Sequence, residues 1–545
     1  MTEQRDGHVF YGSKIYQTAS RDSSAEALAV VGGVVVGAGS VDEASAAASA
    51  AGATQVRQTD LGGGTVIPGL VDSHVHTAYF GLTKNWVDCR PAAVQSIDEL
   101  VALLAPAAAA ADGKAWVRGW GYDDTLIADN RHPTRDDLDR ASRDVPIMIS
   151  HISGHFAVGN SRALELAGID ASSSDPDSGI FIKDDAGKLT GLMWEVGAVR
   201  QLIGAAPAVT PAELESAIEH GLQTAAARGM TTVHDLGVGL QGDAQELAAF
   251  RAMNNAGRLR LKVFGYLVGE LAASLLPNEP KLFEKSGTND YFVIQGAKFW
   301  SDGSIQGLSA ALLEPYHCNH DDSGELLIAA DEFEQRLLPI MQAGGQIAIH
   351  ANGDRAIATV LEVYQNLAKT SAWQTGRHRI EHFQMAHPEH VQQAAQIGAG
   401  VSVFANHIRY WGDRHRDRFV GPERASRMEP LRDVIGGGLH FGLHSDCPIT
   451  PMDPLDMLWT AVNRRTSSNQ VLGAAQCITV EEAIHSLTLD SAWLVGREST
   501  MGSLQTGMAA DFVVLDADLH DDDPAIAQGA QPVATYVDGV NVYSA

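Results

Sequence analysis

The 545-residue chain has few cysteines, no long apolar run and no basic leader. Its four cysteines (Cys89, Cys318, Cys447 and Cys477) are scattered and form no CxxC pair, which excludes a disulfide framework. No stretch reaches the ~18 uninterrupted apolar residues that span a bilayer. The N-terminus also lacks the basic segment and apolar segment of a signal peptide. These absences predict a cytoplasmic protein outside the membrane.

Basic residues are outnumbered in this chain. Lys and Arg total 39 against 67 Asp and Glu, a formal net charge of -28, which repels nucleic acid and anionic membrane surfaces. Hydrophobic residues make up 45% and charged residues 19%, a composition typical of a globular protein with a large core and not of a disordered chain. We therefore expect a small-molecule substrate and neither a nucleic-acid nor a membrane partner. A homodimer is the default expectation for the assembly.

Short strand-like runs occupy both ends of the chain. Residues 27–39 are two apolar runs hinged at a Gly-Gly pair, and an Asp-Gly pair hinges residues 533–545; both are hairpin signals. Because the two ends of a domain often lie close together, we expect residues 1–64 and 496–545 to form one small β-sandwich domain.

The middle of the chain alternates short apolar strands with helix-like stretches. Eight strands are predicted, at residues 65–76, 230–236, 260–268, 291–300, 345–351, 378–385, 400–406 and 439–446. Eight strands with alternating helices indicate an α/β fold of the (β/α)8 TIM-barrel type. We expect the barrel to occupy residues 65–495, with an inserted subdomain at about 85–225 in the long gap after the first strand.

Side chains with metal-binding chemistry stand where the predicted strands end. His74 and His76 are two residues apart, so on a strand both point to one side and can share a metal ion. His350, His382 and Asp446 end the fifth, sixth and eighth strands, and the active sites of such barrels lie at this rim. Taken singly, each of these residues also fits a core or capping role.

Lys298 ends the fourth strand, in the apolar run IQGAKFW. An ammonium group there is costly unless it is paired or chemically changed. Carbamylation by CO₂ would make it a carboxylate-like group able to bridge two cations. The alternative is an ion pair, for which Asp302 and Glu381 are the candidate partners.

Six segments then form a recognisable series. In chain order they are TVIPGLVDSHVH, GAKFWSDGS, IHANGD, RIEHFQM, HSDCPITPMDPL and MGSLQTGMAADFVVLD. Together they resemble the amidohydrolase superfamily, and within it the branch that includes N-substituted formamide deformylases. The resemblance covers nearly the whole chain, including the β-rich ends and the insertion.

The resemblance implies a centre of two divalent metal ions, usually zinc. The implied ligands are His74, His76 and Asp446 for the more buried ion, His350 and His382 for the second, and carbamylated Lys298 as the bridge. Zinc, iron, manganese and cobalt all accept such nitrogen and oxygen ligands. Cys447 stands where the family often has an aromatic residue; it is either a small packing residue or a soft ligand.

The function implied is a metal-dependent hydrolase that cleaves a C–N bond in an amide, N-formyl or related group. A hydroxide bridging the metals attacks the carbonyl, and Asp446 passes a proton to the leaving amine. The same centre would also hydrolyse an ester, lactone or carbamate. A catalytically silent metal-binding or regulatory barrel is the alternative from another class, although the intact ligand set argues against it.

Substrate contacts are expected from the insertion and from the loops at the barrel rim. The candidates are His155, Trp120, Tyr122, Trp194, Glu195 and Asp302. Each also has a structural interpretation. His155 would brace the turn beside Gly154, aromatic residues in such loops often serve packing, and Asp302 would orient a neighbouring ligand.

Overall fold

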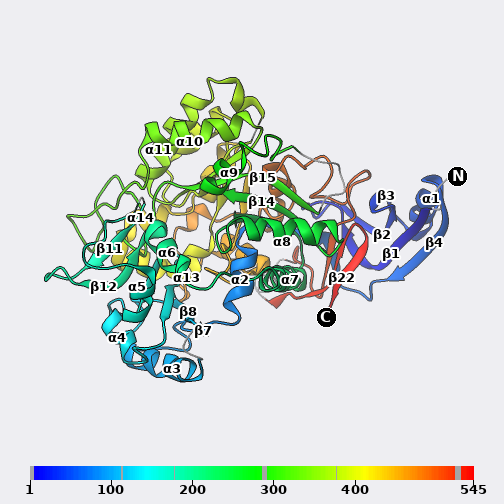
Figure 1. Cartoon of the computed structure of the whole chain (residues 1–545). Coiled ribbons are helices and arrows are strands. Elements are labelled where there is room, and N and C mark those ends of the chain that lie inside the picture. The colour runs from blue at the N-terminus through cyan, green and yellow to red at the C-terminus, as the bar shows by residue number, and fades with distance from the viewer. Residues whose placement is uncertain (1–4, 112–114, 177, 285–290, 376, 522–528) are drawn as a thin grey trace.

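The computed structural model describes residues 5–111, 115–176, 178–284, 291–375, 377–521 and 529–545. Its strands form three sheets: an eight-stranded barrel sheet, an eight-stranded sheet from the two chain ends, and a six-stranded sheet in the insertion. Figure 1 shows the terminal sheet on one side of the barrel and the insertion on the other. In the described residues, no helix has the length and apolar character needed to cross a bilayer.

The barrel sheet is entirely parallel and confirms the expected fold class. Its strands are β6 (Leu70–Val75), β13 (Met230–Val238), β14 (Lys262–Val268), β15 (Phe292–Trp300), β16 (Gln346–Ala351), β17 (Arg379–His382), β18 (Gly400–Val403) and β19 (Phe441–Leu443), paired in that order. Beyond β19 the chain returns to the first strand: the Asp446 amide donates to the His74 carbonyl at 3.0 Å, and the His76 amide donates to the Cys447 carbonyl at 2.9 Å. These two bonds join the ends of the sheet at the metal-binding rim.

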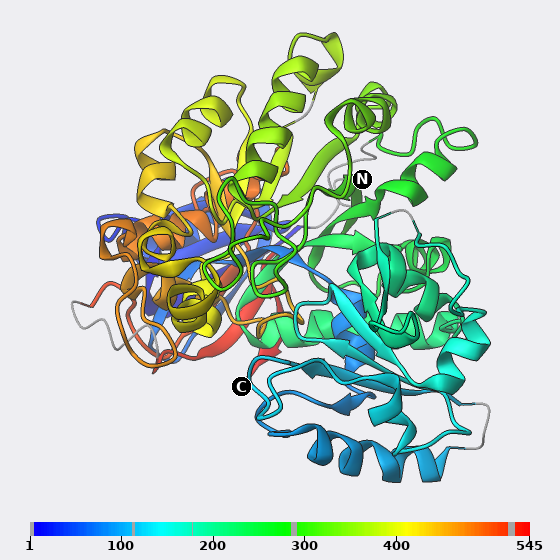
Figure 2. The ribbon, with the colours of Figure 1, turned by 90° about the vertical axis from the view of Figure 1, so that its left-hand side faces the viewer.

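Helices cover the outside of the barrel, as Figure 2 shows from a second side. They are α2 (Thr77–Thr83), α7 (Pro211–Ala227), α8 (Ala244–Asn255), α9 (Gly269–Leu275), α10 (Ala330–Gln342), α11 (Asp354–Leu367), α12 (Pro388–Gln396), α13 (Asn406–Arg414), α14 (Gly421–Arg427), α15 (Leu431–Gly436), α16 (Pro454–Asn463), α17 (Val480–Ser486) and α18 (Leu489–Leu494). The apolar faces of most of these helices share one large core with the strands, as expected for helices layered on a parallel sheet. Helices α13 and α14 pack in separate smaller clusters.

The first predicted strand, residues 65–76, is divided between two sheets. Its first part, β5 (Thr65–Pro68), belongs to the terminal sheet, and only β6 enters the barrel. Gly69 separates them at a crowded point, because a Cβ added there would lie 2.2 Å from the Thr231 hydroxyl oxygen. The change of sheet therefore needs glycine, and β5 joins the strands of residues 1–64 and 496–545.

The terminal sheet has the order β22-β21-β20-β5-β1-β2-β3, with β4 paired to β1. Its other strands are β1 (Arg5–Tyr16), β2 (Ser24–Val31), β3 (Val34–Gly39), β4 (Ala53–Asp60), β20 (Phe512–Leu515), β21 (Pro532–Val537) and β22 (Val540–Ser544). Phe10 on β1 and Tyr536 on β21 are three strands apart, yet their ring centroids are 5.2 Å apart. A flat sheet would separate them by about 14 Å, so this sheet curls until its halves face each other like the layers of a sandwich. Helix α1 (Val41–Ala50) packs beside β1–β4.

The insertion is a subdomain with its own sheet, ordered β11-β12-β10-β9-β8-β7. Its elements are β7 (Val87–Asp88), α3 (Ile97–Ala110), β8 (Val117–Tyr122), α4 (Arg135–Asp139), β9 (Ile147–His151), β10 (Phe156–Gly159), α5 (Ser161–Ala167), β11 (Ile180–Lys183), β12 (Leu189–Trp194) and α6 (Glu195–Gly204). The expected insertion extended to about residue 225 and so included most of α7. In the structure α7 packs closely on α2, where a Cβ added at Gly81 would lie 2.0 Å from the Ala217 carbonyl oxygen. Helix α7 thus belongs to the barrel's outer layer.

Candidate metal centre

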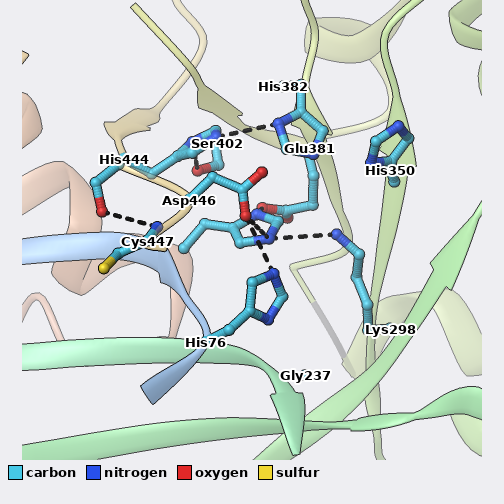
Figure 3. A network of polar contacts seen from close by, with 12 residues as sticks. His76, Gly237, Lys298, His350, Glu381, His382, Ser402, His444, Asp446 and Cys447 are labelled. Atoms are coloured by element: carbon cyan, nitrogen blue, oxygen red, sulfur yellow. Dashed lines mark hydrogen bonds and ion pairs between the residues drawn. The ribbon is translucent and has the colours of Figure 1, made fainter. Parts of the chain in front are cut away.

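The six predicted metal ligands all line one cavity of about 70 Å³ at the carboxyl ends of the barrel strands. They come from four strand ends, of which β6 supplies two, and from the turn after β19: His74, His76, Lys298, His350, His382 and Asp446. Figure 3 shows His76, Lys298, His382 and Asp446 gathered around a common centre. Residues up to 372 positions apart in sequence are thereby placed within reach of one another.

Three of these side chains converge most closely. The Nε2 atoms of His76 and His74 lie 3.1 and 3.4 Å from Oδ1 of Asp446. Ligands held tetrahedrally ~2.0–2.1 Å from a zinc ion are ~3.3 Å apart, so this spacing fits a divalent cation. The Asp446 Oδ1 atom is buried and has no hydrogen-bond partner among the described residues. A bound cation would give this oxygen atom a partner.

Two further imidazoles face the same cavity. The ring centroids of His350 and His382 are 4.4 Å apart. Nε2 of His350 is 3.0 Å from the Gly303 carbonyl, and Nδ1 of His382 is 3.1 Å from Nε2 of His444. Each ring is therefore oriented through one nitrogen and has the other available for a second cation. Burial lowers the pKa of both rings well below the usual value, which keeps them in the neutral form that binds metal.

His74 is fixed by a buried charged pair behind it. Its Nδ1 lies 2.8 Å from Oε2 of Glu381, and Nη2 of Arg379 donates to the same carboxylate oxygen at 2.9 Å. Arg379 and Glu381 are 0% exposed. A carboxylate on Nδ1 directs Nε2 toward the cavity, an arrangement found behind many metal-binding imidazoles.

Lys298 is buried beside these ligands, with its Nζ 3.5 Å from Nε2 of His74. Burial lowers the pKa of Lys298 to about 8, although Glu381 and Asp446 oppose the shift. Neither candidate partner forms an ion pair with it: among the described residues, no carboxylate oxygen lies within 4.0 Å of Nζ. The lowered pKa raises the share of the neutral amine, which is the form that reacts with CO₂.

Asp302 lies outside the residues that line the cavity. Its carboxylate accepts the backbone N–H groups of Ala311, Asn352 and Gly353 at 2.8–3.0 Å. Burial raises the pKa of Asp302 to about 7. These bonds tie the loop after β15 to the loop after β16, so Asp302 supports the rim. Its Oδ1 also lies 3.6 Å from Nε2 of His350, so it reaches the cavity through that ligand.

The insertion places the polar side chain of His155 at the cavity and holds it there through Glu195. His155 lines it, and its Nδ1 lies 2.7 Å from Oε2 of the buried Glu195. Burial disfavours the charged ring, but the Glu195 carboxylate more than offsets this and raises the pKa of His155. Glu195 has a φ of 65°, and non-glycine residues held in this region concentrate at functional sites.

The three predicted aromatic contacts lie outside the cavity lining. Trp120 packs edge-on against Tyr79 with centroids 5.1 Å apart, and Trp194 packs on Phe156 at 4.5 Å. Tyr122 is buried in the insertion core, with its hydroxyl 3.1 Å from Nδ1 of His132. All three pack against other side chains, and Trp120 also lines a separate groove of about 800 Å³.

Two functional residues were missed by the sequence interpretation. His444 lies beside both His74 and His382, with ring centroids 4.9 and 5.0 Å away, and its Nδ1 is 2.7 Å from the Ser402 hydroxyl. Asp72 accepts the His74 amide at 3.1 Å and the Ser445 hydroxyl at 2.5 Å, so it fixes both ligand-bearing turns. Each stands two positions before a ligand, and the two-residue period of a strand would have placed it on the same face.

Comparison with known proteins shows the family to which the chain belongs. The model of the Amidohydrolase family matches residues 57–543. The chain belongs to the amidohydrolase family. This amidohydrolase is accordingly a metal-dependent hydrolase. The barrel and the insertion lie wholly within the matched residues, whereas strands β1, β2 and β3 of the terminal sheet precede them.

Individual relatives cover the amidohydrolase from end to end. It is 28% identical to the amidohydrolase YtcJ of Bacillus subtilis over 98% of this chain and 99% of the relative. It is 27% identical to the N-substituted formamide deformylase of Arthrobacter pascens, over 100% of this chain and 99% of the relative. A crystal structure of an uncharacterized metal-dependent hydrolase from Pyrococcus horikoshii superposes with a TM-score of 0.77 at 25% identity, covering 95% of this chain and 99% of that one.

Proposed function

We propose that this amidohydrolase cleaves the C–N bond of an amide, an N-formyl group or a related group. The observation that carries the proposal is the convergence of His74, His76 and Asp446, whose donor atoms all lie within 4.8 Å of one another in the cavity. The similarity to an N-substituted formamide deformylase supports the C–N bond as the target. The four cysteines are free thiols, which fits the reducing cytoplasm.

The cavity residues would hold two divalent cations, with zinc the expected metal. His74, His76 and Asp446 would hold one cation, His350 and His382 the other, and carbamylated Lys298 would lie between them. When bound, such a pair supplies an acidified water and a polarised carbonyl. The neutral imidazoles of His74, His350 and His382 and the unpartnered Oδ1 of Asp446 suit this role.

Asp446 and His155 would handle the protons and the polar atoms of the substrate. The Asp446 carboxylate faces the cavity, so it can accept a proton from the attacking water and donate it to the leaving nitrogen. His155 is held through Nδ1 by Glu195, which leaves Nε2 free to contact the substrate. Glu195 thereby acts through His155, as a positioning residue.

The test is amine release by the metal-loaded protein from a panel of N-formyl, N-acyl and hydantoin compounds, with lactones and esters included. Asp446→Asn should lower kcat by about 10²–10⁴ on any active compound, whereas Asp42→Asn, an exposed change on α1, should leave kcat unchanged. Lys298→Ala should abolish turnover, and short carboxylic acids should restore part of it. Turnover of lactones or esters alone would favour oxygen-ester chemistry, and a protein that retains no metal and gains no turnover on metal addition would contradict the proposal.

A further inference from the structure

A large groove adjoins the small metal cavity. The cavity has a volume of about 70 Å³ and the groove one of about 1200 Å³. The groove runs between α6 of the insertion and the barrel helices α9 and α10, which Figure 1 places above α6. Val196, Arg200 and Trp300 line both spaces. The two spaces therefore adjoin at these three side chains, and we call this place the doorway.

The groove is mainly apolar. Its wall includes aliphatic and aromatic side chains such as Leu276, Phe299, Ile328 and Ile340, together with four prolines. Phe299 and Trp300 directly follow Lys298 on β15, and Nζ of Lys298 lies 5.4 Å from the Trp300 ring centroid. The apolar wall thus begins at the metal centre itself.

The charged groups in the groove neutralise one another. Arg200 pairs with Asp243 at 3.3 Å and with Glu270 at 3.5 Å, and Arg336 approaches Glu270 at 3.8 Å. Arg336 also bonds to Glu332. Every charged residue that lines the groove, among those described, is therefore paired. An occupant of such a groove gains from apolar contact and has no free charge to bind.

The volume of the metal cavity limits what can stay inside it. A single water needs ~10–15 Å³ on this measure, so 70 Å³ holds about five to seven water-sized groups. The cations and the reacting atoms take up part of this space. Only a small group on one side of the reacting bond fits beside them. A larger group on the other side has to extend out of the cavity, and the doorway faces the largest adjoining space.

We propose that the substrate is asymmetric. One side of its reacting C–N bond carries a small group that stays in the metal cavity, and the other side carries a long, uncharged apolar substituent that passes between Val196, Arg200 and Trp300 into the groove. This inference rests on the proposed function. Hydrolysis consumes one water, breaks the C–N bond and yields an acid and an amine, one of which leaves through the groove.

Two series of amides test the asymmetry with the zinc-loaded wild-type protein. One series lengthens the amine side from N-methylformamide to N-octylformamide, and the other lengthens the acyl side from N-methylformamide to N-methyloctanamide. Each methylene buried in the groove is worth about 0.8 kcal/mol, or about fourfold in kcat/KM. We expect such a rise in one series only, with a fall beyond one or two carbons in the other. An added terminal carboxylate or ammonium group should cancel the rise.

Groove variants give an independent test. Ala273→Trp places an indole in the groove from a small exposed position on α9, and it should lower the octyl-to-methyl ratio of kcat/KM at least tenfold. Ala252→Trp, on the exposed face of α8, is the matched control and should not change this ratio. Hydrolysis without a length preference, or with equal preference on both sides, would overturn the asymmetric substrate but leave the proposed function standing. No amine release from any compound would contradict the proposed function instead.

Discussion

Replacing Arg379 with methionine should destabilise the folded protein by about 3–5 kcal/mol, the usual cost of leaving one partner of a buried ion pair uncompensated. Arg379 and Glu381 are 0% exposed, and the guanidinium holds both oxygens of the carboxylate. It also donates to the Ser73 carbonyl at 2.6 Å. Without the guanidinium, the contact with His74 is the one side-chain hydrogen bond that Glu381 keeps among the described residues, and its charge stays buried.

The double variant Arg379→Met with Glu381→Leu separates stability from metal binding. Removing both charges should recover most of the lost stability, because apolar residues of similar volume often replace a buried ion pair without penalty. His74 nevertheless loses the carboxylate on its Nδ1. Metal affinity should therefore fall about 10–100-fold, even though the double variant is folded.

Chemical denaturation of the metal-free proteins measures the first effect, and competition with a chelator of known affinity measures the second. Glu482→Gln, which removes a half-exposed partner of Arg432, is a control for the general loss of an ion pair and should change stability by less than about 1 kcal/mol. The reasoning is wrong if the free energy of unfolding of Arg379→Met equals that of the wild type. It is also wrong if the double variant is no more stable than the single one.

Three further outcomes follow from other parts of the structure. Lys262→Met should lower stability by about 3 kcal/mol without changing kcat, because Lys262 donates to Asp511 at 2.7 Å and to Asp538 at 2.8 Å between the barrel and the terminal sheet. Burial lowers the pKa of His378 to about 3, and its Nδ1 accepts the Ile347 amide. Below pH ~6.5 the unfolded chain therefore binds a proton at this residue that the folded chain does not. The free energy of unfolding should fall as the pH falls from about 6.5 toward 3. Between pH 7 and pH 5 the wild type should lose about 2 kcal/mol more than His378→Gln in denaturation curves. Chelation should lower the melting temperature and zinc should restore it, since each ion at a concentration 1,000 times its Kd adds about 4 kcal/mol.

Each outcome has a clear contrary result. Equal denaturation midpoints for Lys262→Met and the wild type would show that the two carboxylates tolerate each other without the lysine. A wild type and a His378→Gln variant with parallel pH profiles would mean that His378 titrates normally in the folded protein. A melting temperature unaffected by chelation would argue that the imidazole cluster is stable without cations.

The local pattern of the sequence predicts the barrel strands well, because apolar alternation and length are properties of each segment alone. The predicted segments 291–300 and 345–351 coincide with β15 and β16 within a residue. The division of residues 65–76 was not predictable in this way, since it depends on crowding between Gly69 and Thr231, 162 positions later. The placement of α7 likewise depends on its packing partner α2.

The same distinction applies to the site. His74, His350 and Asp446 were found because ligands sit at strand ends, which the sequence marks. Glu381 was considered only as a partner of Lys298, whereas the structure pairs it with His74, 307 positions away. Such long-range pairing is set by how the strands close into a cylinder, and no feature near Glu381 encodes it.

The position of the terminal sheet bears on how the protein can be handled. Strand β5 enters β6 at its amino end, and Lys262 at the start of β14 is tied to the same sheet, so the sheet lies at the end of the barrel opposite the imidazoles. Both chain ends leave from this sheet (Figure 1). An enzyme anchored to a resin through either end would present its reactive opening to the flowing solution, and the support would not block the passage of reactants.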